Sequence, residues 1–121
     1  MTRRFSICAL VLCATALSAC GGTSDKDKIT SIIKTVGKNP VSLCNTYATA
    51  SLLQQAGGKA NCQRAAKAPG AKDPNVKIDS VSVNGSNATA KVTSQNGADK
   101  GKVVTITFVK QGGSWKVANT S

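Results

Sequence analysis

The period of the hydrophobic residues changes once along this chain, and this change constrains the fold most strongly. Up to Ala68 the spacing is helical, with apolar residues at i, i+3, i+4 and i+7 in the set Ile29, Ile32, Ile33 and Val36. From Val76 onward the period is two, as in half-buried strands. Helices that precede strands are typical of an α+β domain, in which the helices cover one face of an antiparallel sheet.

Three helices are expected before the change of period. The first ends at Gly37, a common stop signal. A second begins after Asn39 as a cap with Pro40 at the first helical position, and Gly57 ends it. Its apolar face consists of Leu43, Tyr47, Ala50 and Leu53. The third covers 60–68.

Four strands are expected after the change, over 76–83, 87–94, 102–110 and 114–119. The pairs Asn84–Gly85 and Gly112–Gly113 predict hairpin turns between them. In the first strand the apolar residues change face, which predicts a bulge between Ile78 and Val81. The expected fold is therefore two to three helices packed on a curved four-stranded antiparallel sheet.

The N-terminal residues have the layout of a secretory signal peptide. Arg3 and Arg4 precede an apolar run over 5–17, and the small residues Ser18 and Ala19 follow it. A membrane-spanning helix needs about 20 apolar residues, whereas a polar segment follows this run at once. Residues 1–19 are therefore predicted to be a cleaved leader.

The cysteine at the end of this leader carries a second signal. Leu17, Ser18, Ala19 and Cys20 resemble the lipobox of bacterial lipoproteins. That resemblance implies a diacylglycerol on the Cys20 sulfur, cleavage just before Cys20, and an extracytoplasmic protein held on the cell membrane. Residues 20–27 would then be the acylated cysteine and a flexible tether, and 28–121 a single α+β domain. An unmodified secreted chain with a chance cysteine is the alternative.

The remaining cysteines fit an exported protein. Of five cysteines, Cys8 and Cys13 leave with the leader and Cys20 takes the lipid, so that Cys44 and Cys62 remain. In an oxidising compartment two cysteines most simply form a disulfide, with two separate buried thiols as the alternative. No metal site or cofactor is expected, because the chain has no His and too few cysteines to hold a metal.

The charge of the chain is strongly basic. The formal net charge is +11, and removal of Arg3 and Arg4 with the leader lowers it to +9. The lysines are spread along the chain with few aromatic residues among them, which argues against nucleic acid as a partner. A solvated surface and attraction to anionic lipid or envelope polymer both remain open.

The order of elements and the ending Gly113, Ser114, Trp115, Lys116, Val117 resemble the nuclear transport factor two-like (cystatin-like) superfamily, and within it small lipoproteins of actinobacteria. The resemblance covers about 27–119. It implies a cone whose mouth can hold a small apolar ligand. The candidate lining residues are Ile33, Tyr47, Leu53, Ile106, Phe108 and Trp115.

A few members of that superfamily are enzymes that use Asp, His or Tyr, but this chain has no His. Asp79 and Tyr47 are the residues that could form an acid–base pair. We predict a non-catalytic binding or accessory module with a mostly filled core, whose partner is the membrane together with an anionic envelope polymer or an envelope protein. A carrier of small hydrophobic ligands, an enzyme using Asp79 and Tyr47, and a structural envelope protein are the alternatives.

Overall fold

The computed structural model describes residues 24–121 and has the α+β architecture that the change of period predicts. Helical segments come first, and a four-stranded antiparallel sheet in the order β1-β2-β3-β4 follows. The predicted leader and the predicted lipid attachment site Cys20 lie outside the described residues. The likeness to a cystatin-like cone stays a prediction.

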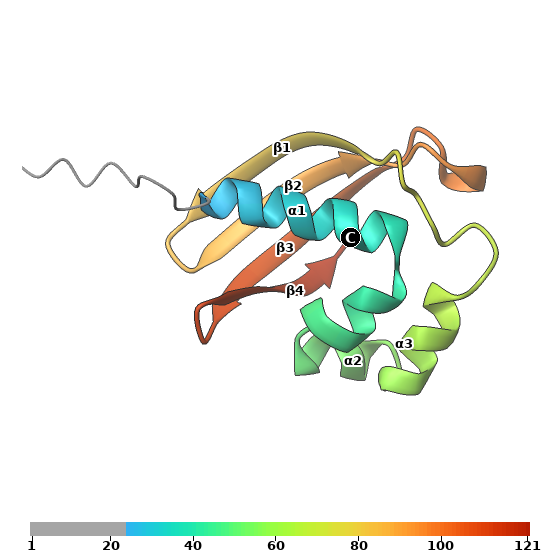
Figure 1. Cartoon of the computed structure of the whole chain (residues 1–121), viewed down its shortest axis with the longest axis horizontal. Coiled ribbons are helices and arrows are strands. Elements are labelled where there is room, and N and C mark those ends of the chain that lie inside the picture. The colour runs from blue at the N-terminus through green and yellow to red at the C-terminus, as the bar shows by residue number, and fades with distance from the viewer. Residues whose placement is uncertain (1–23) are drawn as a thin grey trace, which may run out of the picture.

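Helix α1 spans Asp25–Lys38 and lies across one face of the sheet (Figure 1). It buries Ile29, Ile32 and Ile33, part of the predicted stripe, against the strands. The helix begins earlier than predicted, because 25–27, expected to belong to the tether, form its first turn. Ser24 caps this turn, since its hydroxyl accepts the backbone N–H of Asp27 at 3.2 Å.

The prediction of one continuous second helix is wrong. The segment forms a π-helical turn, η1 (Leu43–Tyr47), and a separate short helix, α2 (Ala50–Gln55). Between them Ala48 pairs with Val117 in a parallel bridge, and the backbone N–H of Thr49 donates to the Val117 carbonyl at 3.0 Å. The last strand therefore takes hydrogen bonds that a continuous helix would have used.

The prediction that Leu53 faces the core is also wrong. Because the helix restarts at Thr49, its phase shifts, and Leu52 packs against the core instead. Helix α3 (Lys59–Ala66) follows, close to the predicted 60–68. Helices α2 and α3 lie together at one end of the sheet (Figure 1).

The strands agree with the predicted ones to within one residue at each end. They are β1 (Lys77–Asn84), β2 (Asn87–Thr93), β3 (Val103–Gln111) and β4 (Ser114–Thr120), with a 3-10 turn, η2 (Gly97–Asp99), between β2 and β3. The predicted bulge is confirmed, because the register of β1 against β2 shifts between Ile78 and Ser80. Asp79 is the extra residue. Bulges increase the twist of a sheet, which lets it curve around α1.

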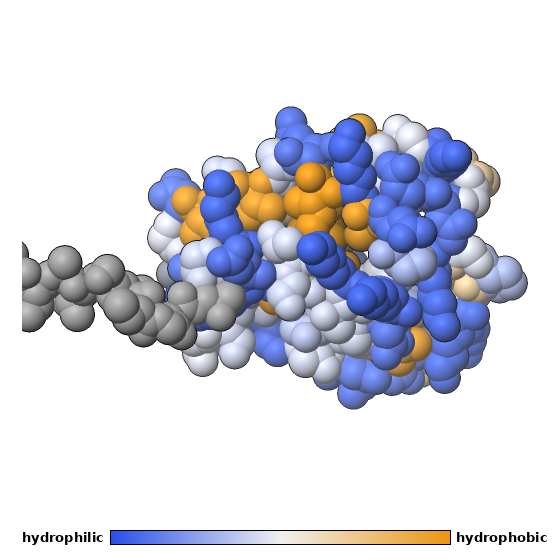
Figure 2. Space-filling view, turned by 45° about the horizontal axis from the view of Figure 1, so that its top comes forward, coloured by the Kyte–Doolittle hydropathy of each residue, from blue (hydrophilic) through white to orange (hydrophobic). Residues whose placement is uncertain are grey.

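The core lies between α1 and the inner face of the sheet. Ile29 and Phe108 are fully buried in it. The alternation predicted for β2 is confirmed, since Ala88, Ala90 and Val92 are all buried. Figure 2 shows that apolar side chains also reach the surface, in a band surrounded by hydrophilic ones. The apolar content of this small domain is thus not fully enclosed.

Candidate functional site

A cavity of about 200 Å³ lies between the second half of α1 and the sheet. Its wall comes from α1, the segment after it, the loop before β1, and strands β2, β3 and β4. Most of the side chains are apolar, including Ile33, Val36, Val76, Ile106, Phe108 and Val117. An apolar cavity of about 150 Å³ can hold benzene, so this one has room for a ring-sized apolar group. It is smaller than the roughly 300 Å³ or more of typical drug-sized ligand pockets.

The end of α1 is joined to the loop before β1 at the edge of this cavity. The backbone N–H of Asp73 donates to the Gly37 carbonyl at 2.8 Å. A Cβ atom on Gly37 would lie 2.5 Å from the Asp73 carbonyl oxygen, so only glycine permits this approach without displacement of the loop. Gly37 was predicted as a helix stop, and its close contact with Asp73 adds a second role.

Asp73 and Thr120 carry the polar side chains among the described residues of this wall. Oδ2 of Asp73 accepts the backbone N–H of Gln95 at 2.9 Å and the hydroxyl of Ser94 at 3.1 Å. Its other oxygen, Oδ1, is buried and has no hydrogen-bond partner among residues 24–121. The sequence did not single out Asp73, because a loop aspartate before a proline carries no periodic signal.

The predicted lining residues are divided between two places. Ile33, Ile106 and Phe108 line the cavity. Tyr47 and Trp115 line a more open hollow near the start of α1, together with Lys28 and Ser31. Leu53 belongs to neither lining. The structure therefore brings only half of the predicted set together.

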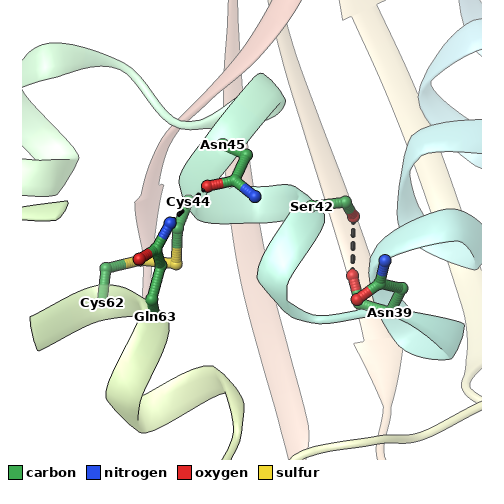
Figure 3. The surroundings of a disulfide bond; sticks show 6 residues. All are labelled: Asn39, Ser42, Cys44, Asn45, Cys62 and Gln63. Atoms are coloured by element: carbon green, nitrogen blue, oxygen red, sulfur yellow. Dashed lines mark hydrogen bonds between the residues drawn. A yellow bond between two sulfur atoms is a disulfide. The ribbon is translucent and has the colours of Figure 1, made fainter. Parts of the chain in front are cut away.

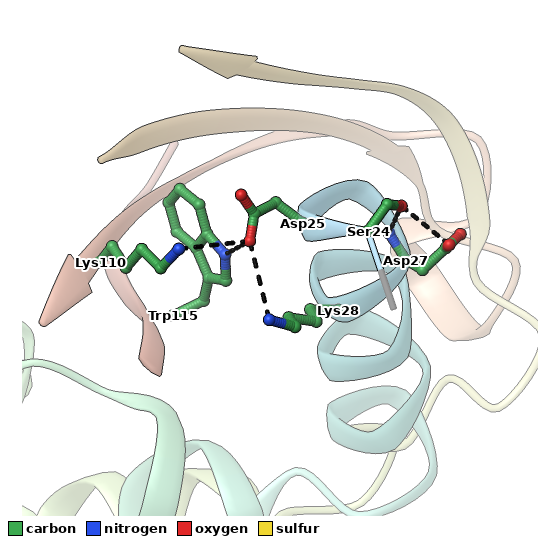
Figure 4. A network of polar contacts seen from close by, with 6 residues as sticks. All are labelled: Ser24, Asp25, Asp27, Lys28, Lys110 and Trp115. Atoms are coloured by element: carbon green, nitrogen blue, oxygen red, sulfur yellow. Dashed lines mark hydrogen bonds and ion pairs between the residues drawn. The ribbon is translucent and has the colours of Figure 1, made fainter. Parts of the chain in front are cut away.

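A cluster of charged side chains surrounds the indole nitrogen of Trp115 (Figure 4), and one of them, Lys28, also lines the hollow. Oδ1 of Asp25 accepts the indole N–H of Trp115 at 3.0 Å, and the ammonium nitrogens of Lys110 and Lys28 lie 3.5 Å and 3.9 Å from the same oxygen. These contacts, the Trp115 hydrogen bond above all, hold the pKa of Asp25 below its ordinary value. Lys110 also lies 5.6 Å from the centroid of the Trp115 ring. The hydrogen bond from Trp115 joins α1 to β4, and the two lysines balance the negative charge of Asp25.

Asp79 and Tyr47, the candidate acid–base pair, are not brought together. Asp79 lies on β1, where it accepts the Thr93 hydroxyl at 2.5 Å and has Lys77 at 3.8 Å. Tyr47 lies beside the start of β4, in the hollow that Trp115 also lines. Because β1 and β4 are the two edges of the sheet, the width of the sheet separates the two side chains.

The predicted disulfide between Cys44 and Cys62 is present and joins η1 to α3 (Figure 3). The Cα atoms are 5.8 Å apart, within the usual range for such bonds. Beside it the amide of Gln63 donates to the Asn45 side chain at 2.6 Å. Two links thus hold α3 against the segment that follows α1, which contributes Pro40 and Leu43 to the cavity wall.

Searches of the described residues for two further features give none. Residues 24–121 contain no group of three or more His, Cys, Asp or Glu side chains placed to hold a metal ion. In the same part of the chain, no helix has the length and hydrophobicity that crossing a membrane requires.

Comparison with known proteins gives no match: no family model fits the chain, and no curated protein or solved structure is similar to it. A function for this chain must therefore be inferred from its own residues.

Proposed function

We propose that the domain is a non-catalytic binding module that takes a small apolar molecule into the cavity beside α1, and that a lipid on Cys20 holds the chain on the outer face of the cell membrane. The observation that carries the binding proposal is the cavity itself. Its volume of about 200 Å³ matches one ring-sized group, and its wall is apolar apart from Asp73 and Thr120.

The wall is suited to binding rather than to acid–base chemistry. Burial of apolar surface contributes about 25 cal/mol per Å² and needs no directional partner. The two side chains expected to form a catalytic pair lie at opposite edges of the sheet. A binding module therefore accounts for the arrangement better than the enzyme alternative.

The position of the cavity on α1 suits a tethered binding module. Cys20 precedes Asp25, the first residue of α1, by only a few residues. The helix has 14 residues and is about 21 Å long, at about 1.5 Å per residue. The cavity lies along its second half, so that an anchor at the N-terminus would leave the cavity away from the lipid attachment point.

Titration of the purified protein with toluene, followed by NMR of the backbone amides, tests the binding proposal. We expect saturable shifts at residues of the cavity wall such as Val36, Val92 and Ile106. The variant Ala71→Leu, which places a larger apolar side chain in the wall, should abolish these shifts. Ala60→Leu makes the same change at an exposed position of α3 and should leave them unchanged. Shifts absent from the wall, or equal in both variants, would contradict the proposal.

A second candidate, attraction to an anionic polymer or lipid surface, rests on the distribution of charge. From Lys28 to Lys72 inclusive the chain has seven basic residues and no acidic one. Four of them, Lys59, Arg64, Lys67 and Lys72, are exposed on α3 and the loop after it. The helical half therefore carries much of the positive charge, and a field of one sign attracts anionic surfaces.

Vesicles containing phosphatidylglycerol test this second candidate on a chain of residues 21–121, which lacks both the apolar leader and the lipid attachment site. Binding should weaken steeply as salt rises past about 0.15 M, where the Debye length is about 8 Å. Replacing Lys59 and Lys67 by Gln should weaken binding more than the same change at Lys91 and Lys100. Equal effects of the two pairs, or binding that does not respond to salt, would leave the charge with a role in solubility.

A further inference from the structure

Asp73 is the acidic residue in the wall of the cavity, and its two carboxylate oxygens have different surroundings. Oδ2 accepts hydrogen bonds from Gln95 and Ser94. Oδ1 is buried and has no partner among residues 24–121. Buried polar atoms are nearly always hydrogen-bonded in folded proteins, so this oxygen requires an explanation.

The carboxylate of Asp73 also lacks a positive partner. Asp25, Asp79 and Asp99 each have a lysine nitrogen within 4.0 Å, whereas no Lys or Arg of residues 24–121 forms such a pair with Asp73. Asp27 also lacks such a pair, but it is exposed to solvent, whereas Asp73 is partly buried. Its two hydrogen-bond donors, a hydroxyl and a backbone amide, are both neutral. The carboxylate at the cavity is thus short of one donor and of one positive charge.

We propose that the ligand of the cavity is a small apolar amine, whose ring-sized body fills the apolar part and whose ammonium group donates to Oδ1 of Asp73. This inference rests on the proposed binding function. An ammonium group offers three donors and no acceptor, which complements an acceptor-only carboxylate. Hydrogen bonds between two charged groups are about twice as strong as neutral ones.

The surroundings of Asp73 hold its carboxylate in place. Its backbone N–H donates to Gly37 at 2.8 Å, and its carbonyl accepts the N–H of Val76 at 3.2 Å. With Oδ2 occupied by Gln95 and Ser94, Oδ1 is the oxygen left for a molecule in the cavity. Because Oδ1 is closed off from solvent, the amine reaches it only when a neighbouring side chain of the wall moves aside.

Two probes of similar size separate the apolar body from the amine. Toluene carries the body alone, and benzylamine adds an ammonium group at neutral pH. Dissociation constants are measured by the same amide shifts in about 0.15 M salt, which screens the net positive charge of the chain. The dissociation constant of each probe is compared between the normal protein and a variant. The free energy of removing the probe from water is the same in both cases and therefore cancels.

The variant Asp73→Asn keeps the shape of the side chain. Its carbonyl oxygen must stay with the Gln95 N–H, so its NH2 group takes the place of Oδ1 and offers a donor instead of an acceptor. We expect Asp73→Asn to raise the dissociation constant of benzylamine about tenfold and to change that of toluene by less than about twofold. Asp79→Asn removes the same charge near the start of β1, outside the cavity wall, and should leave the affinity for both probes unchanged.

The outcomes distinguish this inference from the function on which it rests. If toluene and benzylamine both bind and Asp73→Asn affects them equally, the amine inference is overturned and the binding function stands. If Asp79→Asn weakens benzylamine as much as Asp73→Asn does, long-range charge explains the effect and the inference also fails. If neither probe shifts the wall residues, both proposals fail.

Discussion

Trp115 donates its indole N–H to Oδ1 of Asp25 at 3.0 Å, and this bond joins residues 90 positions apart in the sequence. It fastens the first turn of α1 to β4. At the other end of the same helix, the Gly37 carbonyl accepts the N–H of Asp73. Helix α1 is therefore held at both ends, and the cavity lies beside the second of these attachments.

The first attachment predicts a pH dependence of stability. The pKa of Asp25 is lowered in the folded protein, chiefly by the Trp115 hydrogen bond and also by the two lysines. A lowered pKa means that the ionised form stabilises the fold at pH values above the ordinary 3.8. That contribution declines as the pH falls below this value and through the lower pKa of the folded state. Thermal unfolding between pH 7 and pH 2 measures the decline.

Asp25→Asn isolates this effect, because its amide oxygen can still accept the indole N–H while the charge is lost. The melting temperature of the normal protein should exceed that of Asp25→Asn at pH 7, and the difference should shrink in acid. Trp115→Phe removes the largest cause of the lowered pKa, so the difference should be smaller in its background. A difference that stays constant down to pH 2 would contradict this assignment.

The fold could be predicted where the sequence repeats a local pattern. The four strands follow from the alternation of residues such as Ala88, Ala90 and Val92, which one buried face imposes. The bulge at Asp79 follows from the change of face within β1. The start of α1 also has a local signal, because a Ser three residues before an acidic residue, as Ser24 is before Asp27, is typical of a helix cap.

The break in the second helix and the role of Asp73 could not be predicted in this way. Ala48 and Thr49 leave the helix because Val117, far along the chain, pairs with them. Asp73 reaches the cavity because of bonds to Gly37, Ser94 and Gln95, none of which is local. Such contacts form between residues far apart in the sequence, so the spacing of apolar residues within a segment does not predict them.

The disulfide predicts a large loss of stability on reduction. Cys44 and Cys62 are 18 positions apart, and closing a loop of that size stabilises a fold by about 3 kcal/mol. For a domain of this length, that corresponds to about 10–20 °C in melting temperature. Reduction should produce this decrease, whereas the variant with both cysteines replaced by Ser should not respond to reductant. Free thiols at both positions in freshly isolated protein would contradict the assignment.

The lipobox resemblance predicts covalent lipid at Cys20. Mass spectrometry of the N-terminal peptide should find an acylated Cys20 as the first residue, and Cys20→Ser should abolish both the acyl mass and that cleavage. Two acyl chains give stable membrane attachment, whereas one gives only marginal binding. The acylated protein should therefore be recovered in the membrane fraction. A mature N-terminus well downstream of Cys20, with no acyl mass, would rule out this interpretation.

The contact between Gly37 and Asp73 predicts that Gly37→Ala destabilises the domain. Ala is a better helix former than Gly, by about 1 kcal/mol, so the propensity of α1 alone predicts a gain. However, the added Cβ would lie 2.5 Å from the Asp73 carbonyl oxygen, which belongs to backbone and cannot rotate away. Overpacking of this kind costs about 1–3 kcal/mol, so we expect a net loss of about 1 kcal/mol in the free energy of unfolding.

Hydrogen exchange at the Asp73 amide distinguishes this cause from a general effect on the helix. In the normal protein that amide is bonded to the Gly37 carbonyl at 2.8 Å and should exchange slowly. Gly37→Ala should speed its exchange more than that of Ile33, whose amide lies within the helix. Thr35→Ala, an exposed position on the same helix, improves the helix propensity without touching the loop and should leave the Asp73 amide protected. A Gly37→Ala protein that is more stable than the normal one would show that the loop yields without cost, and that the joint does not fix the edge of the cavity.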